Sequence, residues 1–211
     1  CIPFAIVGAR LYYVVFEWER YAANPLSALN LRGGGLAIHG GLIFGIGLMC
    51  YILYKRKQNV LKWMDMAFTG VALAQAIGRW GNYFNSEAHG TPTDLPWAIE
   101  VDGQLVHPTF LYESLWCFLL CIFLVWLDER NLKNSKGFDG QLACLYVILY
   151  SVERFFVEGL RTDSLYIGPS RIIRQAQLLS VVLIVVGIAA YFVLRKRKAK
   201  NKEADKQEDV A

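Results

Sequence analysis

Long stretches without charged side chains constrain the fold of this chain more than any other feature. Residues 35–54 contain a single imidazole and no charge, and residues 178–194 contain no charged or amide side chain. An α-helix of about 20 residues crosses a hydrocarbon core of about 30 Å. Apolar side chains make up 55% of the 211 residues, which is more than a soluble domain of this size usually carries. The sequence therefore predicts an all-α polytopic membrane protein.

Six apolar segments alternate with polar ones, and we expect each to form one transmembrane helix of a bundle. They are residues 1–16, 35–54, 61–77, 111–127, 141–156 and 176–194. The chain begins with Cys1 inside an apolar run, so we expect a fragment or processed chain that lacks its N-terminal part. We interpret residues 1–194 as one membrane domain and residues 195–211 as a charged, solvated and mobile tail.

Basic clusters predict the orientation of these helices. Loops rich in Lys and Arg stay on the cytoplasmic side of a membrane. Clusters occur at residues 55–57, 130–136 and 195–202, and an even number of predicted crossings separates each pair. The C-terminus is therefore expected in the cytoplasm. Seven unusual polar residues then gather at the opposite, outer surface: His39, Arg79, His107, Glu113, Arg154, Glu158 and Arg161.

The stretch GRWGNYFNSEAHG, residues 78–90, follows the third apolar segment. Its polar residues and glycines are Gly78, Arg79, Gly81, Asn82, Asn85, Glu87, His89 and Gly90. Glycines allow tight turns and close approach of a ligand to the backbone. An arginine at the mouth of an apolar helix needs an anionic or buried partner. We expect the phosphate of a lipid to be that partner.

A second group of charges lies on the fifth segment and at the start of the fourth. Arg154 and Glu158 are spaced i, i+4, so they share one face of a helix and can form an intrahelical ion pair without further function. Two arginines near one surface also suit a phosphodiester, because guanidinium groups bind phosphate oxygens in pairs. Glu113 is a site candidate inside a membrane segment, or the anchor of an arginine. Arg161 is expected at the level of the lipid headgroups.

Three further features have alternative interpretations. His39 lies between glycines at an expected outer helix end, where it is either functional or structural, and Gly41, Gly45 and Gly47 also suit close helix packing. The five cysteines lie in apolar runs, which favours buried thiols over disulfides or a metal site. The dipeptide Asp102-Gly103 between alternating apolar residues predicts an extracytoplasmic β-hairpin. It is either a lid or docking surface or a structural cap.

Four motifs together resemble one family. The stretch GRWGNYFNSEAHG is similar to the signature of the prolipoprotein diacylglyceryl transferases, which are bacterial inner-membrane enzymes. The segments IHGGL around His39, HPTFLYE at residues 107–113 and RFFVEGLRTD at residues 154–163 resemble other blocks of that family, in the same order. The resemblance extends from Cys1 to about Leu194. Two departures are visible: Tyr83 where the family usually has Phe, and Phe110 where many members have Gln.

The resemblance implies a fold and a reaction. The family has seven spans, so the six predicted here would follow a missing one. The enzyme would transfer a diacylglyceryl group from phosphatidylglycerol to the thiol of the lipobox cysteine of a prolipoprotein, releasing glycerol phosphate at the outer side of the membrane. This is the first step of lipoprotein maturation. Its partners would be phosphatidylglycerol, the prolipoprotein signal-peptide region and membrane lipids. We expect no nucleic acid, cofactor or metal.

Combined with the charges, the resemblance suggests roles for the site residues. The predicted catalytic residues are His39, Arg79, Arg154 and Glu158, and the predicted substrate-binding residues are Arg79, Asn82, Asn85, Glu87, Gly90, Glu113, Arg154 and Arg161. The two arginines would bind the phosphate, and Glu87 and Glu158 would orient them. The asparagines would contact the headgroup or hold the loop. His39 or a carboxylate would take the proton of the thiol.

A membrane transporter or lipid-binding protein is the rival class. A transport site is expected near the midplane of the bilayer, often between repeated halves of the sequence. In this chain the polar residues gather at one predicted surface, and the sequence has no repeated half. These features favour the enzyme.

Overall fold

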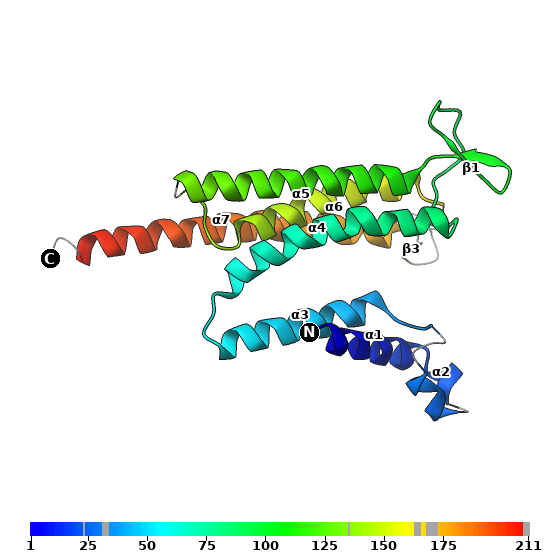
Figure 1. Cartoon of the computed structure of the whole chain (residues 1–211), viewed down its shortest axis with the longest axis horizontal. Coiled ribbons are helices and arrows are strands. Elements are labelled where there is room, and N and C mark those ends of the chain that lie inside the picture. Colours follow the sequence, from blue (N-terminus) through cyan, green and yellow to red (C-terminus); the bar gives the residue numbers. More distant parts are fainter. Residues whose placement is uncertain (23, 31–33, 135, 163–165, 168–172, 209–211) are drawn as a thin grey trace. The chain divides into compact units, whose positions relative to one another are not determined.

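The fold is described from a computed structural model of the whole chain (Figure 1). It describes residues 1–22, 24–30, 34–134, 136–162, 166–167 and 173–208, without the side chains of Ile38, His39, Tyr166, Ile167, Ile173 and residues 202–208. The helices are α1 (Ile2–Phe16), α2 (Trp18–Tyr21), the 3-10 helix η1 (Pro25–Leu29), α3 (Ile38–Lys55), α4 (Val60–Phe84), α5 (Thr109–Asn134), α6 (Gln141–Leu160) and α7 (Gln175–Glu208). The strands are β1 (Ile99–Val101), β2 (Gln104–Val106), β3 (Tyr166–Ile167) and β4 (Ile173–Arg174).

The protein is mostly helical, and each predicted apolar segment falls largely within one helix. Two helices are long and apolar enough to cross a membrane, Thr109–Asn134 and Gln175–Asn201, by length and hydropathy among the described residues. Two shorter helical stretches, Ile2–Phe16 and Gly40–Lys55, are also apolar. Membrane association is therefore supported, whereas a bundle of six crossings stays a prediction.

The chain divides into two compact units, residues 1–60 and residues 61–211. The membrane domain expected over residues 1–194 and the boundary at residue 195 both stay predictions. Helix α7 continues into the charged segment that we expected to be a mobile tail, and it ends at Glu208.

In the first unit α1 packs against α3 through small residues. A Cβ atom on Gly40 would lie 2.3 Å from the carbonyl oxygen of Gly8, so only glycine fits at this crossing. Gly41 and Gly45 also face α1, as predicted for helix packing, whereas nothing lies within 4 Å of a Cβ placed on Gly47. The small-residue face predicted on this helix is therefore confirmed at two of its three positions.

Arg10 organises the segment that leads to α3. Its side chain is only 7% exposed, and its guanidinium group lies 5.2 Å from the centre of the Tyr21 ring. It donates hydrogen bonds to four backbone carbonyls, those of Ser27, Ala28, Gly34 and Gly35, at 2.6–3.0 Å. Because these bonds satisfy the buried charge, an arginine inside an apolar helix is tolerated here as a structural tie.

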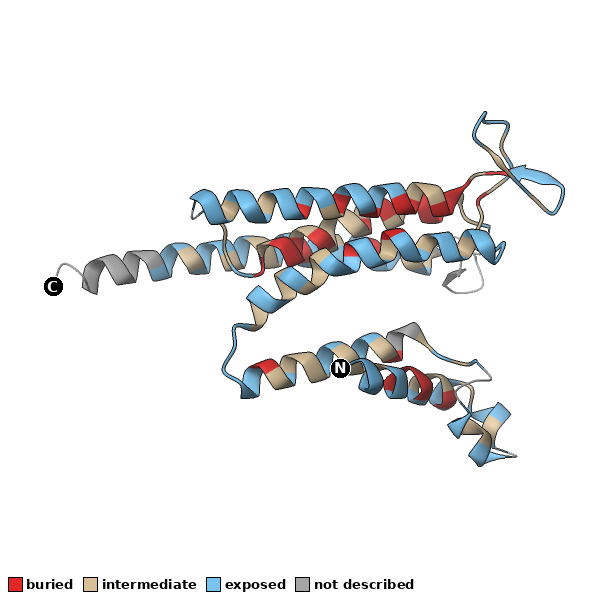
Figure 2. Ribbon diagram, viewed as in Figure 1, coloured by how far each residue is buried: buried red, intermediate tan, exposed pale blue. Residues whose placement is uncertain are grey.

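In the second unit α6 packs between α5 and α7. The apolar core of this unit contains Ala72, Leu120, Leu124, Leu142 and Tyr146. Figure 2 shows the buried residues of α5 gathered toward the end that leads to the hairpin, and they include the polar residues Thr109, Glu113 and Ser114. The buried part of this unit is therefore polar where α5 begins and apolar further along the helix.

Asp65 joins α4 to the start of α6. Its two carboxylate oxygens each accept a backbone N–H at 2.8 Å, one from Gly140 and one from Ala143. The first amides of a helix have no partner within the helix, so a side-chain acceptor stabilises that end. An acidic residue inside a predicted span is thereby explained as a helix cap supplied by another helix.

Strands β1 and β2 form an antiparallel hairpin in which Val101 pairs with Gln104. Asp102 and Gly103 occupy the two-residue turn with φ of 50° and 78°, the left-handed values that such a turn requires. The other edge of β2 is bonded to the segment after the signature, because the amide of Thr93 donates to the carbonyl of Leu105 at 2.9 Å. The position of this hairpin outside the cytoplasm stays a prediction.

Candidate active site

Most of the signature stretch is helical. Helix α4 continues to Phe84, so Arg79 and Asn82 project from its last turns. Gly78 and Gly81 are also helical, and nothing lies within 4 Å of a Cβ placed on either, so the tight turn expected at these glycines is wrong. Glycine alone does not end a helix when the neighbouring residues pack, so α4 continues through both positions.

A buried carboxylate joins the two arginines that the sequence singles out. Glu113 Oε2 lies 3.1 Å from Nε of Arg79, and Glu113 Oε1 lies 2.9 Å from Nη1 of Arg154. The glutamate side chain is 2% exposed, whereas those of Arg79 and Arg154 are 20% and 22% exposed. Of the two interpretations of Glu113, the structure therefore favours the anchor of an arginine, and it anchors both.

Each arginine has a second contact that fixes the plane of its guanidinium group. Arg154 Nη2 lies 2.8 Å from Glu158 Oε2, the i, i+4 ion pair read from the sequence. Arg79 Nη2 donates to the hydroxyl of Tyr150 at 3.3 Å. Two cations and two carboxylates are thus brought together from α4, α5 and α6. We refer to Arg79, Glu113, Arg154 and Glu158 as the arginine cluster.

The loop after α4 is held by Glu87. Its Oε1 atom accepts hydrogen bonds from the side-chain amides of Asn82 at 3.0 Å and Asn85 at 3.3 Å. Both contacts lie within the signature, and the two arginines pair with Glu113 and Glu158 instead. The expectation that Glu87 orients an arginine is therefore wrong, because the chain turns back at the end of α4 and brings this carboxylate to the asparagines.

The backbone beside Glu87 adopts an unusual conformation. Ser86 and Ala88 have φ of 53° and 57°, in the left-handed region that side chains other than glycine rarely occupy. The hydroxyl of Thr109, which is fully buried, donates to the carbonyl of Ala88 at 2.5 Å. This bond holds the loop against the start of α5.

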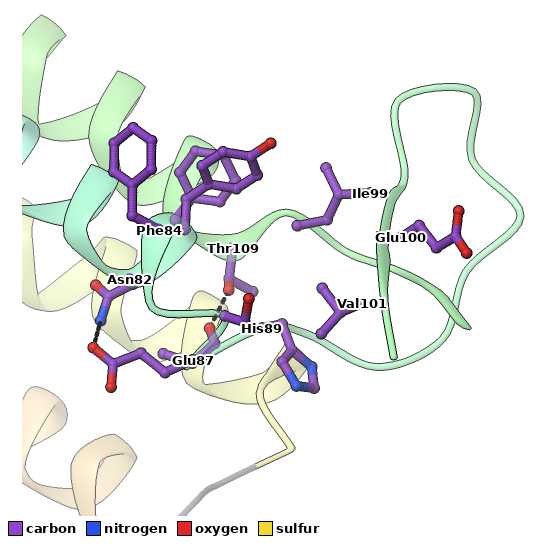
Figure 3. A pocket seen from close by; sticks show the side chains of 12 residues that line it. Asn82, Phe84, Glu87, His89, Ile99, Glu100, Val101 and Thr109 are labelled. Atoms are coloured by element: carbon purple, nitrogen blue, oxygen red, sulfur yellow. Dashed lines mark hydrogen bonds between the residues drawn. The ribbon is translucent and has the colours of Figure 1, made fainter. Parts of the chain in front are cut away.

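A cavity of about 280 Å³ lies between this loop and the hairpin. Figure 3 shows Asn82, Glu87 and His89 on the loop side and Ile99 and Val101 on the strand side. The predicted residues Asn82 and Glu87 line it, whereas those of the arginine cluster do not. Arg79 and Asn82, both near the end of α4, therefore belong to two different places, the arginine cluster and the loop cavity.

Gly90 and Arg161 connect the loop to the end of α6. They form an antiparallel β-bridge, and the amide of the next residue, Thr91, donates to the carbonyl of Leu160 at 2.8 Å. Gly90 is buried, and a Cβ at this position would lie 2.6 Å from the Cβ of His107. The structure thus brings Arg161 to the signature stretch, and only glycine fits where the loop passes His107.

His39 is the predicted site residue that the structure does not place. It lies in the first turn of α3, in the other unit of the chain, and its side chain is outside the described residues.

All five cysteines are described and none forms a disulfide; Cys117 and Cys144 are buried, and Cys1 is exposed. Cys117 and Cys144 therefore agree with the buried thiols that the sequence favours.

Two residues of the site were missed by sequence reasoning. Tyr150 contacts Arg79, and Glu153 lies beside the cluster, in electrostatic range of Arg79, Glu113 and Arg154. Both lie on α6 within one turn of Arg154. The signal for Glu153 was present in the sequence, because a glutamate inside a predicted span is itself a site candidate.

Comparison with known protein families gives a match that covers most of the chain. A family described as prolipoprotein diacylglyceryl transferase matches residues 1–193. The chain belongs to the prolipoprotein diacylglyceryl transferase family. The resemblance drawn from the four motifs is therefore confirmed, and the chain is a transferase of that family.

Curated relatives of this transferase carry a consistent name. Proteins named phosphatidylglycerol–prolipoprotein diacylglyceryl transferase from Finegoldia magna and Clostridioides difficile are 51% and 54% identical to this chain. The alignments cover 96% and 95% of the chain and 79% and 77% of the relatives. A protein of the same name from Clostridium botulinum (strain Loch Maree) is 50% identical over 93% of the chain and 78% of its own length.

Proposed function

We propose that the chain transfers a diacylglyceryl group from phosphatidylglycerol to the lipobox cysteine of prolipoproteins, the first step of bacterial lipoprotein maturation. A thioether forms, and glycerol phosphate is released. Relatives about half identical over most of the chain are named for this activity. The observation in the structure that carries the proposal is the pair Arg79 and Arg154, held together on the carboxylate of Glu113.

The arginine pair suits the phosphate of the lipid. A guanidinium group has five N–H donors, and the contacts of Arg79 engage Nε and one Nη group. Arg154 is engaged through its two Nη groups. Both side chains are about one-fifth exposed, so a phosphate can reach donors that these contacts do not use. Such donors, fixed before the lipid arrives, stabilise an anion without rearrangement.

The same geometry supports the bond-breaking step. When sulfur attacks the glyceryl carbon, the C–O bond breaks and its electron pair stays on a phosphate oxygen. That oxygen gains negative charge in the transition state, and donors aimed at it lower the barrier. Glu113 and Glu158 contribute by holding the guanidinium planes in place.

The loop residues are proposed to bind the rest of the headgroup. Glu87 fixes the side-chain amides of Asn82 and Asn85 through their N–H donors, which leaves their carbonyl oxygens as acceptors for glycerol hydroxyls. Gly90 brings the backbone close to His107, and Arg161 is bridged to it. The cavity beside Asn82 and Glu87 is the proposed place for this end of the lipid.

The nucleophile is proposed to be the substrate's thiol. A thiol reacts as the thiolate, so a base must accept its proton. His39 or a carboxylate of the site is proposed for this role. If a cysteine-free variant that is stable and folded were wholly inactive, the nucleophile would belong to this chain and not to the substrate.

We also propose the arrangement in the membrane. Six helices, α1, α3, α4, α5, α6 and α7, would cross the cytoplasmic membrane, with the arginine cluster toward the outer side. The basic residues after α3 and at the end of α7 support cytoplasmic ends there. The β1–β2 hairpin would then face outward, where it can serve as a lid or as a docking surface for the prolipoprotein.

One experiment separates this function from lipid transport. The purified protein is incubated in vesicles with phosphatidylglycerol labelled in its diacylglyceryl part and with a lipobox peptide. Covalent label on the peptide and release of glycerol phosphate support the transferase, whereas lipid movement without bond formation supports a transporter.

Variants then test the roles of single residues in the same assay. Arg79→Ala is expected to abolish release of glycerol phosphate, and wild-type release would refute the phosphate role. If His39→Gln left the rate and its pH profile unchanged, His39 would be structural.

A further inference from the structure

Glu153 is a buried acid that, unlike the neighbouring glutamates Glu113 and Glu158, forms no ion pair among the described residues. It is 5% exposed, and neither carboxylate oxygen has a hydrogen-bond partner among the described residues. Glu113 and Glu158 are also buried, but both form ion pairs with arginines of the cluster. Glu153 is therefore the buried glutamate of this region that can change its protonation state without breaking an ion pair with an arginine.

The surroundings of Glu153 come from three helices. Glu153 interacts electrostatically with Arg79 on α4 and with Glu113 and Cys117 on α5. On its own helix it interacts with Tyr150 and Arg154. Glu158 adds a third carboxyl group through Arg154. With all groups ionised, two guanidinium groups face three carboxylates. A proton taken up by Glu153 would balance these charges.

We propose that Glu153 accepts the proton of the substrate thiol; this inference rests on the proposed transferase function. The S–H bond breaks, and the proton binds a carboxylate oxygen of Glu153. The electron pair left on sulfur forms the S–C bond to the glyceryl carbon, and the C–O bond breaks with its electrons on the phosphate oxygen. The proton of Glu153 then leaves with the phosphate or to water, which restores the carboxylate.

Charge balance explains why this position is suitable. The phosphate gains one negative charge in the reaction, and the proton removes one negative charge from a carboxylate beside the same arginines. The net charge of the region therefore stays constant during the reaction, and adding net charge to a place largely shielded from water is costly. Protonating Glu113 or Glu158 instead would break an ion pair that holds an arginine.

The test compares two lipobox peptides, one with cysteine and one with selenocysteine at the acceptor position. A selenol ionises at much lower pH than a thiol and needs no base at neutral pH. The full chain in phosphatidylglycerol vesicles is assayed as wild type and as Glu153→Gln. We expect kcat with the cysteine peptide to fall about 100-fold, and kcat with the selenocysteine peptide to change less than about threefold. The rate of Glu153→Gln with the cysteine peptide should rise with pH as bulk thiolate forms.

Ser151→Ala is the matched control. Ser151 lies on the same helix, is 1% exposed and also has a side-chain oxygen without a hydrogen-bond partner in the described part of the chain, but it does not titrate near neutral pH. Its variant should keep the wild-type rates with both peptides. If Glu153→Gln does not fold, Glu153→Asp must show a larger loss with the cysteine peptide than with the selenocysteine peptide.

Three outcomes would overturn the proposal. An equal loss with both peptides would make Glu153 structural, and no loss with the cysteine peptide would exclude it from proton transfer. A difference between the peptides that arises from His39→Gln and not from Glu153→Gln would make His39 the acceptor. If wild-type protein modifies neither peptide, the transferase function itself fails, which is a separate result.

Discussion

Glu113 Oε2 lies 3.1 Å from Nε of Arg79, although the two residues belong to different helices. The other oxygen of the same carboxylate lies 2.9 Å from Nη1 of Arg154. One buried acid therefore sets the distance and the direction of two cations. In the proposed function this carboxylate holds both arginines close enough together to bind one phosphate.

The first prediction concerns this bridge. Glu113→Gln removes the charge that both arginines share, and leaving buried charges without their partner is strongly destabilising. We expect the release of glycerol phosphate from phosphatidylglycerol to fall about 100-fold and the protein to unfold at a lower temperature. Glu129→Gln, an exposed position on the same helix, is the control and should change neither. A fully active Glu113→Gln would show that the bridge is not needed.

The hydroxyl of Tyr150 gives a milder prediction. Tyr150→Phe removes the acceptor of Arg79 Nη2 and leaves the ring in place. A hydrogen bond to a charged group contributes about 1.5 kcal/mol, so we expect kcat/KM for phosphatidylglycerol to fall about tenfold. Tyr54→Phe on the exposed surface of α3 serves as the control. An effect as large as that of Arg79→Ala would mean that Tyr150 has a role beyond orienting the arginine.

Gly90 gives a steric prediction. In Gly90→Ala the new methyl group meets the Cβ of His107 at 2.6 Å and the carbonyl oxygen of His107 and the Thr109 side chain at 3.1 Å. Forcing this contact apart costs about 1–3 kcal/mol, and it moves the loop away from β2. Thermal unfolding and the rate of peptide modification should both be impaired. Gly70→Ala, in α4 with nothing within 4 Å, should be as stable as wild type or more so.

The cap that Asp65 provides for α6 gives a prediction in which stability changes and activity does not. Asp65→Ala removes both acceptors for the amides of Gly140 and Ala143, and loss of a helix cap costs about 1–2 kcal/mol. We expect a lower unfolding temperature, with the rate per folded molecule unchanged, as measured by thermal unfolding in detergent beside the vesicle assay. Asp128→Ala, at an exposed position of α5, is the control. A selective loss of rate would connect this end of the helix to the site.

Much of the fold could be predicted from local patterns. Apolar runs of suitable length indicated the helices, and Asp102-Gly103 indicated the hairpin turn, since both signals depend on neighbouring residues. The ion pair of Arg154 with Glu158 followed from helical spacing alone. What depends on one helix or one turn of chain was therefore accessible from the sequence.

Relationships between helices were not accessible in this way. Spacing cannot reveal that Glu113 lies between Arg79 and Arg154, or that Tyr150 contacts Arg79, because these contacts depend on the packing of three helices. Charge and predicted depth suggest an arginine as the partner of Glu87, but the turn at the end of α4 brings this carboxylate to two asparagines. The buried position of Glu153 near Arg79 and Glu113 likewise depends on how these helices pack.

The cap supplied by Asp65 has a consequence for how the protein is made. Asp65 and Gly140 are 75 positions apart, so the ribosome synthesises the aspartate long before the residues whose amides it binds. A nascent chain that contains α4 but not yet α6 carries this carboxylate without these partners. The contact between α4 and the start of α6 can therefore form only after Ala143 has been synthesised. A chain halted earlier lacks the hydrogen bonds that stabilise the beginning of α6.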